Sequence, residues 1–170
     1  EENVDNPSIF KSTISILNQL ASEYGVPVIV STHPRTRKRL NSSKGIDLDS
    51  RISFQKPFGF FDYIQLQKNA LCVISDSGTI SEESAILNFP AITLRNSMER
   101  PEALDSGSII LTGFDTNTVL SSIKLVIDQH KVNNIEKTIP NEYLIPDTSQ
   151  RVLNLIMGTT KLSNTWEGIK

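Results

Sequence analysis

Apolar residues recur along the chain with two different spacings, which predicts helices and strands in alternation. Between residues 8 and 24 they return every three or four positions, as on one face of a helix, at Ile9, Ile14, Ile16, Leu17 and Leu20. Similar patterns predict helices at 59–68, 79–88, 101–105, 116–130 and 151–157. Short apolar runs predict buried strands at 26–30, 51–54, 70–74, 91–94 and 108–112.

This alternation is typical of a parallel sheet that is covered by helices on both faces. With right-handed crossovers it gives an α/β, Rossmann-like doubly wound domain. Pro7 is placed to start the first helix and Gly25 to end it. Residues 34–40 are expected to form a short basic helix or a loop, 41–50 a turn region, 131–147 a connection and 159–170 a polar tail.

Composition narrows the possible functions. The 170 residues, 38% of them apolar, suit one domain with a real core, and a net charge of −2 disfavours a nucleic-acid binder. The single cysteine, Cys72, can form neither an internal disulfide nor a multi-thiolate zinc site, and its apolar strand predicts core packing. With no signal peptide and no apolar run of about 18 residues, we expect a soluble cytoplasmic protein that does not enter the membrane.

The N-terminal sequence is unlike a natural start. It lacks an initiator Met, and residues 1–7 are polar, with no strand before the first helix. We therefore expect a domain that belongs to a longer protein.

Polar and charged residues follow the predicted strands, where parallel sheets place their ligands. They occur at 31–34, 55–59, 75–78, 95–99 and 112–113. The segment 75–83 is the most informative, because a small turn between a strand and a helix presents N–H groups and the positive end of the helix dipole to an anion. Gly78 allows close approach of a phosphate, and Ser77 adds a hydroxyl donor.

A purely structural explanation also fits this segment. Thr79 and Glu82 have the spacing of a capping box, which would order the turn and is compatible with anion binding. Glu82 and Glu83 could be solvated helix surface, or a carboxylate one turn into the helix could accept hydrogen bonds from both ribose hydroxyls, as acidic groups do in dinucleotide sites. Together with the charged segment 95–102, the turn points to a phosphorylated ligand, most simply a nucleotide sugar.

Several motifs, taken as a set, resemble the non-hydrolysing UDP-N-acetylglucosamine 2-epimerases. They are Asp76-Ser-Gly-Thr-Ile-Ser-Glu-Glu83, Asn88-Phe-Pro-Ala91, Arg95, Glu99-Arg-Pro-Glu102, Gly107 and Leu111-Thr-Gly113. Glu1-Glu-Asn3 is similar to the end of that family's His-Arg-Glu-Asn loop. The resemblance covers about residues 1–130 and implies a two-domain fold like the GT-B glycosyltransferases. It identifies residues 1–158 as the UDP-binding C-terminal domain.

The resemblance also implies roles for individual residues. Ser77 and Gly78 would bind the diphosphate, with Asp76 shaping the turn, and Glu83 would bind the ribose. Phe60 or Tyr63 would stack on uracil, although aromatics at helical spacing are more often core residues. The remaining implied contacts are His33 near the nucleotide or a regulatory sugar site, and Arg95, Glu99 and Arg100 around the phosphates. His33 could instead be a simple loop residue, and Arg100 could pair only with neighbouring glutamates.

The implied reaction is C2 epimerisation of a UDP-N-acetylhexosamine by elimination and re-addition of UDP. The catalytic acid and base are expected mainly in the N-terminal domain, so this chain alone is expected to bind UDP weakly without turnover. Because Thr79 replaces the second glycine common after the serine, the sequence is closer to the capsule and O-antigen branch, which forms UDP-N-acetyl-L-fucosamine. Family members are usually dimers, so a homodimer is expected for the full-length protein.

Two other functions remain open at this point. A GT-B glycosyltransferase domain would use the same sheet edge and a UDP sugar, and a Rossmann-like domain could bind a partner without catalysis. The sequence holds neither a metal-binding cluster nor a Gly-x-Gly-x-x-Gly motif, so neither a metal nor NAD is expected.

Overall fold

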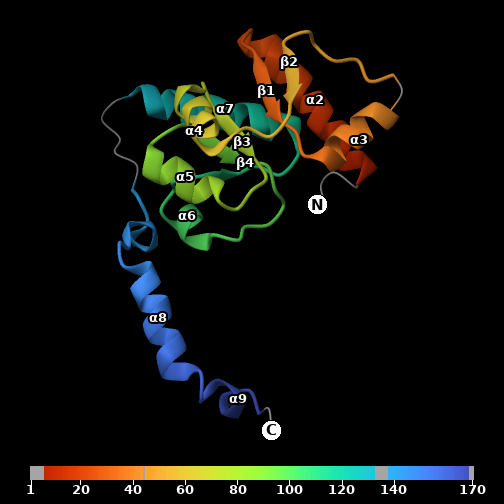
Figure 1. Cartoon of the computed structure of the whole chain (residues 1–170). Coiled ribbons are helices and arrows are strands. Elements are labelled where there is room, and N and C mark those ends of the chain that lie inside the picture. The colour runs from red at the N-terminus through yellow and green to blue at the C-terminus, as the bar shows by residue number, and fades with distance from the viewer. Residues whose placement is uncertain (1–5, 44, 133–137, 169–170) are drawn as a thin grey trace.

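A computed structural model describes residues 6–43, 45–132 and 138–168 (Figure 1). Its helices are α2 Pro7–Tyr24, α3 Pro34–Ser42, α4 Phe60–Asn69, α5 Ile80–Leu87, α6 Pro101–Asp105, α7 Thr116–Lys131, the 3-10 helix η1 Asn141–Leu144, α8 Thr148–Thr159 and α9 Ser163–Trp166. Its strands are β1 Val28–Ser31, β2 Ile52–Gln55, β3 Val73–Ser75, β4 Ala91–Thr93 and β5 Ile110–Leu111. The predicted alternation of strands and helices is therefore confirmed.

The strands are parallel, as predicted, but their hydrogen bonds form two sheets. β1 pairs with β2, whereas β4 lies between β3 and β5. The two sheets lie in different parts of the body in Figure 1, with β1 and β2 beside α2 and α3. β4 is buried along its whole length, whereas β1 exposes half of the Ile29 side chain.

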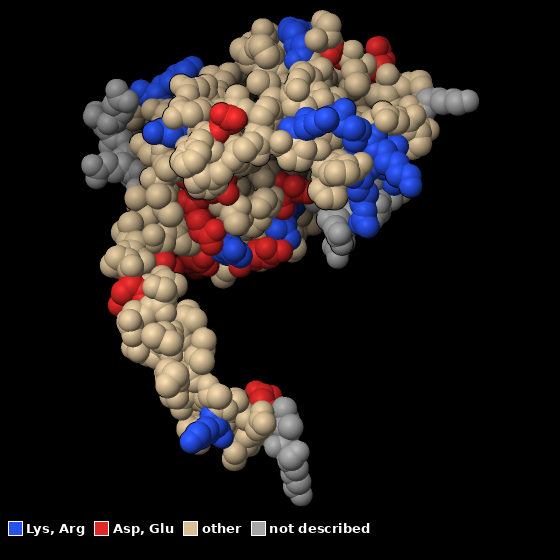
Figure 2. Space-filling view, viewed as in Figure 1, with Lys and Arg blue, Asp and Glu red and all other residues tan. Residues whose placement is uncertain are grey.

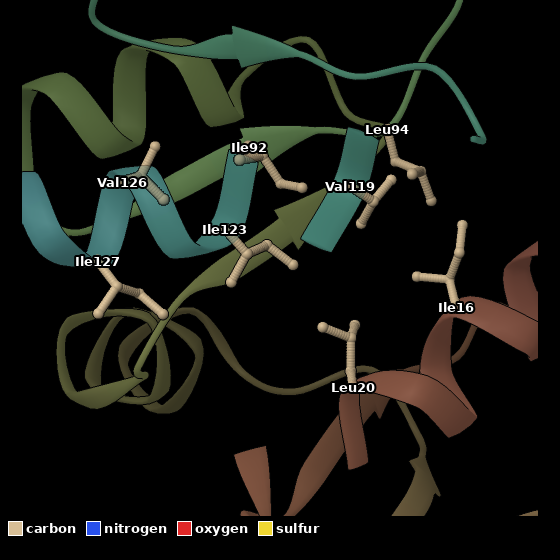
Figure 3. Close-up of a cluster of buried hydrophobic side chains, with 8 residues drawn as sticks. All are labelled: Ile16, Leu20, Ile92, Leu94, Val119, Ile123, Val126 and Ile127. Atoms are coloured by element: carbon tan, nitrogen blue, oxygen red, sulfur yellow. The ribbon is translucent and has the colours of Figure 1, made fainter. Parts of the chain in front are cut away.

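The main hydrophobic core packs α2, which lies beside the β1–β2 sheet, against β4 and α7. Ile16 and Leu20 of α2 point toward β4 and α7, where they meet Ile92, Leu94, Val119, Ile123, Val126 and Ile127 (Figure 3). Cys72 is partly buried against this cluster, in agreement with its predicted packing role. Burial of these aliphatic side chains, each worth about 1.5–3 kcal/mol, fixes β3 and β4 and hence the turns that follow them.

Both ends of α2 are set by capping residues in the local sequence. The Asn6 side chain accepts hydrogen bonds from the backbone N–H groups of Ser8 and Ile9, and Pro7 occupies the first turn. Gly25 ends the helix at φ 64°, a left-handed conformation that favours glycine. The predicted alternatives for 34–40 resolve as helix α3.

The C-terminal part extends away from the body. α8 and α9 lie at the end of an arm in Figure 1, and all residues of α8 except Thr159 are exposed. The helix predicted at 151–157 is thus longer, and the segment predicted as a polar tail includes α9. Among the described residues, no helix is both long and apolar enough to cross a bilayer.

Candidate functional site

The turn between β3 and α5 is built largely by its own serines. The N–H of Ser77 donates to Ser75 Oγ over 3.1 Å, and the hydroxyls of Ser77 and Thr79 lie 3.0 Å apart. α5 then begins at Ile80, so its N-terminal end faces the turn. Within the described chain, the N–H groups of Gly78 and Thr79 are left without protein acceptors, which suits an anion.

The predicted capping box at this helix is wrong. Thr79 has a helical backbone and its side chain makes no capping hydrogen bond. Glu82 instead accepts a 2.8 Å hydrogen bond from Arg100 Nε. Attraction to a guanidinium is stronger than a bond to one backbone N–H, so the carboxylate turns toward Arg100.

Arg100, which lies between β4 and α6 in the chain, brings a positive charge to the turn. Its Nε binds Glu82, and its Nη1 lies 3.9 Å from Glu99 Oε2. Arg95 forms a 2.5 Å ion pair with Glu99. These pairs lower the pKa of Glu99, mainly through the hydrogen bond from Arg95, and raise the pKa of Arg100, mainly through that to Glu82.

Gly78 faces this charged cluster at close range. A Cβ atom at Gly78 would lie 2.7 Å from Glu99 Oε2 and 3.4 Å from Arg100 Nη1. The missing side chain therefore leaves room for charged groups directly over the turn. Four of the predicted site residues, Ser77, Gly78, Arg95 and Arg100, are thus brought together, with Glu99 occupying part of the space between them.

Glu83 lies in the first turn of α5 and contacts α4. Its Oε2 accepts a 2.5 Å hydrogen bond from Nε2 of Gln67, a buried side chain on α4. Tyr63 belongs to this group too, because it lies one turn before Gln67 on the same face of α4. Burial, and to a lesser degree the Glu83 charge, raises the pKa of Tyr63, while the nearby Gln67 amide opposes the shift. Glu83 and Tyr63 are therefore neighbours in the structure.

The other predicted residues are more separate. Phe60 is 72% exposed and makes an edge-to-face contact with the exposed Phe61, with ring centroids 5.5 Å apart. His33 follows β1 in the other sheet, and its Nδ1 accepts a hydrogen bond from the N–H of Arg35. In the described part of the chain, His33 thus caps α3 and does not join the cluster at Gly78.

Sequence reasoning missed Gln67. Its only signal is position: it follows Tyr63 by four residues, so both side chains lie on one face of α4. The partner Glu83 lies 16 residues further along the chain, and no local pattern predicts that pairing.

Charged side chains of both signs gather on the body near the base of the C-terminal arm (Figure 2). Basic residues also gather over α3, where Arg37 donates to the Phe54 carbonyl and Arg39 lies 5.3 Å from the Phe10 ring centre. Within the described ranges, no group of three or more His, Cys, Asp or Glu is arranged to hold a metal ion.

Comparisons with known proteins agree with this geometry. Residues 1–157 match the family described as UDP-N-acetylglucosamine 2-epimerase. A relative of that name from Methanococcus maripaludis is 32% identical over 163 residues, which are 94% of this chain and 43% of the relative. The chain thus spans less than half the length of this relative.

Solved structures give the same result. The UDP-N-acetylglucosamine 2-epimerase of Rickettsia bellii superimposes with a TM-score of 0.80 at 38% identity, over 95% of this chain and 44% of that one. The Methanocaldococcus jannaschii enzyme in complex with UDP-GlcNAc and UDP gives a TM-score of 0.75 at 29% identity, over 92% and 42%. The α/β fold is thus that of one half of these GT-B-like enzymes, and the chain belongs to the UDP-N-acetylglucosamine 2-epimerase family.

Proposed function

We propose that this chain is the nucleotide-binding C-terminal domain of a UDP-N-acetylhexosamine 2-epimerase, comprising residues 1–158. The observation that carries the proposal is the assembly at Gly78. There the start of a helix meets a guanidinium from 22 residues further along the chain, 3.4 Å from the point that a Cβ atom would occupy. A diphosphate needs both N–H donors and a cation. The M. jannaschii relative binds UDP-GlcNAc and UDP, which supports the same ligand class here.

The nucleotide would lie along the start of α5. Its diphosphate would contact Ser77 and Gly78, with Arg95 and Arg100 beside it, and its ribose would contact Glu83. Tyr63 is favoured over Phe60 as the uracil platform, because Tyr63 neighbours Glu83. His33 remains a predicted contact to the nucleotide or to a regulatory sugar.

In the proposed reaction, UDP leaves C1 of the sugar as a proton leaves C2, and UDP adds back after the C2 proton returns on the other face. The chain supplies stabilisation of the negative charge that grows on the departing diphosphate, through the turn and Arg95 or Arg100. The acid and base that move the C2 proton are proposed to lie in the N-terminal domain. No metal or NAD enters this scheme.

The N-terminal part of the full-length protein is also the proposed partner of this chain. The exposed apolar side chains of α8 support this, because α8 exposes Leu155 by 64% and Met157 by 75%, and apolar surface of this kind is typical of an interface. A homodimeric, cytoplasmic full-length enzyme remains our prediction. Ser77-Gly-Thr79 supports the branch that forms UDP-N-acetyl-L-fucosamine.

The experiment is an assay of the full-length protein in D₂O with UDP-N-acetylglucosamine and with the 6-deoxy-talose-type UDP sugar. The proposal predicts a C2 epimer that carries deuterium at C2, observed by proton NMR. UDP release onto an acceptor without a C2 epimer would instead indicate the GT-B glycosyltransferase alternative. Absence of any change in either UDP sugar would favour the non-catalytic alternative.

A further inference from the structure

We propose that Gln67 is a positioning residue that holds the Glu83 carboxylate in place for the nucleotide ribose. This inference rests on the proposed function, because it concerns the same nucleotide site. It adds a residue from α4, outside the turn and outside the helix that carries Glu83.

The link between the two side chains is short and shielded from water. Gln67 is only 2% exposed, and its Nε2 lies 2.5 Å from Glu83 Oε2. A hydrogen bond to an ionised carboxylate is among the stronger ones in proteins, and burial strengthens it further. The bond ties the last turn of α4, the helix before β3 in the chain, to the first turn of α5, the helix after it.

The chemistry of the pair allows one orientation of the amide. An ionised carboxylate only accepts hydrogen bonds, so Gln67 must present its NH₂ group to Glu83. Its Oε1 is then buried without a hydrogen-bond partner among the described residues. Leaving that acceptor unpaired costs stability, and a role in holding Glu83 accounts for an amide being kept at this buried position.

The arrangement leaves Glu83 able to bind a second group. One oxygen is engaged by Gln67, while a carboxylate offers about four acceptor positions. Glu83 is half-buried, so it reaches the surface beside the turn. Two adjacent ribose hydroxyls are donors of the right kind, and their capture depends on the direction in which the carboxylate points.

Tyr63 connects the base side of the site to the same amide. It precedes Gln67 by four residues, so both side chains lie on one face of α4, and the Gln67 amide and the Glu83 charge both act on the pKa of its hydroxyl. Gln67 thus lies between Tyr63, one turn earlier on α4, and Glu83, to which it is hydrogen-bonded, so it links the proposed uracil platform to the proposed ribose acceptor.

The test compares UDP with 2′-deoxy-UDP by calorimetry on the full-length protein. The wild type is expected to prefer UDP by about tenfold or more, the size of one hydrogen bond to a charged group. In Gln67→Met, which keeps the volume and removes the donor, the preference should fall below about threefold while the affinity for 2′-deoxy-UDP stays within about twofold. Gln65→Met, an exposed position on the same helix, should retain the full preference.

A merely structural Gln67 would give a different result. Gln67→Met would then keep the preference for UDP over 2′-deoxy-UDP, or would lower the affinity for both ligands by the same factor. Either result would overturn the positioning role of Gln67 and leave Glu83 as the proposed ribose ligand. A wild type that binds both ligands equally would overturn the ribose assignment of Glu83 and the positioning role together. Should Gln67→Met fail to fold, Gln67→Asn, which withdraws the donor by one methylene, is expected to show the same loss of preference.

Discussion

At the scale of single residues, Gly78 is the position where the geometry makes the strongest demand. Its backbone is compatible with other residues, since its φ is not in the left-handed region, but the space beside its Cα is taken by Glu99 and Arg100. The requirement for glycine therefore comes from close approach of charged groups and not from backbone strain.

Gly78→Ala is expected to weaken UDP binding by about tenfold or more, a loss of about 1.4 kcal/mol per factor of ten. The new methyl group would lie 2.7 Å from Glu99 Oε2 and would occupy the space for the diphosphate. Stability should change little, because Glu99 is the end of an exposed, flexible side chain. Calorimetry measures the binding, and Gly158→Ala, whose Cβ meets open space, is the matched control. Equal UDP affinity in both variants would contradict the placement of the diphosphate at Gly78.

Glu99→Gln is expected to raise the affinity for UDP by several-fold. Glu99 is a negative charge beside the proposed diphosphate, and it holds Arg95 in an ion pair. Removing its charge reduces repulsion of the phosphates and weakens the ion pair with Arg95, so that more of the Arg95 charge acts on the phosphates. Binding curves at low and high salt measure the effect, which should shrink as salt screens the charges. Glu23→Gln, an exposed change on α2, serves as the control, and a weaker affinity in Glu99→Gln than in this control would refute the expectation.

At the scale of elements, the sequence predicted the order and type of most helices and strands, because the spacing of apolar residues reports directly on burial. α2 and α7 agree with their predicted ranges within one residue at most ends. β3 and β5 are shorter than predicted, because strand ends depend on hydrogen bonds to neighbours and not on apolarity alone. For the same reason, the split into two sheets was not predictable from periodicity.

The arrangement of the predicted site residues was less predictable from the sequence than the order of the elements. The sheet-edge rule placed Ser77, Gly78 and Arg95 at one edge and the resemblance added Arg100, and the structure brings these four residues near one another. The pairing of Glu82 with Arg100, 18 residues apart, replaced the predicted cap, since long-range ion pairs leave no local pattern. The pairing of Gln67 with Glu83 was not predicted for the same reason.

The segment between α3 and β2 supplies a pH-dependent prediction. Asp49 accepts hydrogen bonds from the side chain and the backbone N–H of Arg51, and the Arg51 side chain lowers the pKa of Asp49 to about 2. Because the pKa is lower in the folded state, the stabilisation is complete above the unfolded value near 4 and is lost as pH falls toward about 2.

Asp49→Asn should therefore lower the urea midpoint at pH 7, and its difference from the wild type should disappear between about pH 4 and pH 2. Urea denaturation at a series of pH values measures this. In an Arg51→Leu background the same substitution should have a much smaller effect, because the guanidinium that lowers the Asp49 pKa is gone. A difference that is constant down to about pH 2 would show that Asp49 acts only through its shape.

At the scale of the whole molecule, the chain consists of a packed body and an extended arm. The body buries its apolar residues between α2, α7 and β4, whereas α8 exposes most of its own (Figure 1). In Figure 2 the visible surface of α8 is mostly uncharged. The two parts therefore respond differently to mutation.

Ile123→Ala is expected to destabilise the isolated chain by about 2–5 kcal/mol, the usual cost of a core cavity. Leu155→Ala should change its stability by less than about 0.5 kcal/mol, because that side chain is 64% exposed. Denaturation of both variants provides the measurement. In the full-length protein Leu155→Ala should become clearly destabilising, and a neutral effect there would contradict the proposed cover over α8.

The most direct test of the central claim is hydrogen–deuterium exchange of the full-length protein with and without UDP, read by mass spectrometry. We expect UDP to slow exchange in peptides covering 73–87 and 95–102, and Gly78→Ala to remove this protection. Protection confined to another surface, such as the hollow lined by Arg37, Leu40 and Phe54, with 73–87 unchanged, would contradict the placement of the nucleotide at the β3–α5 turn.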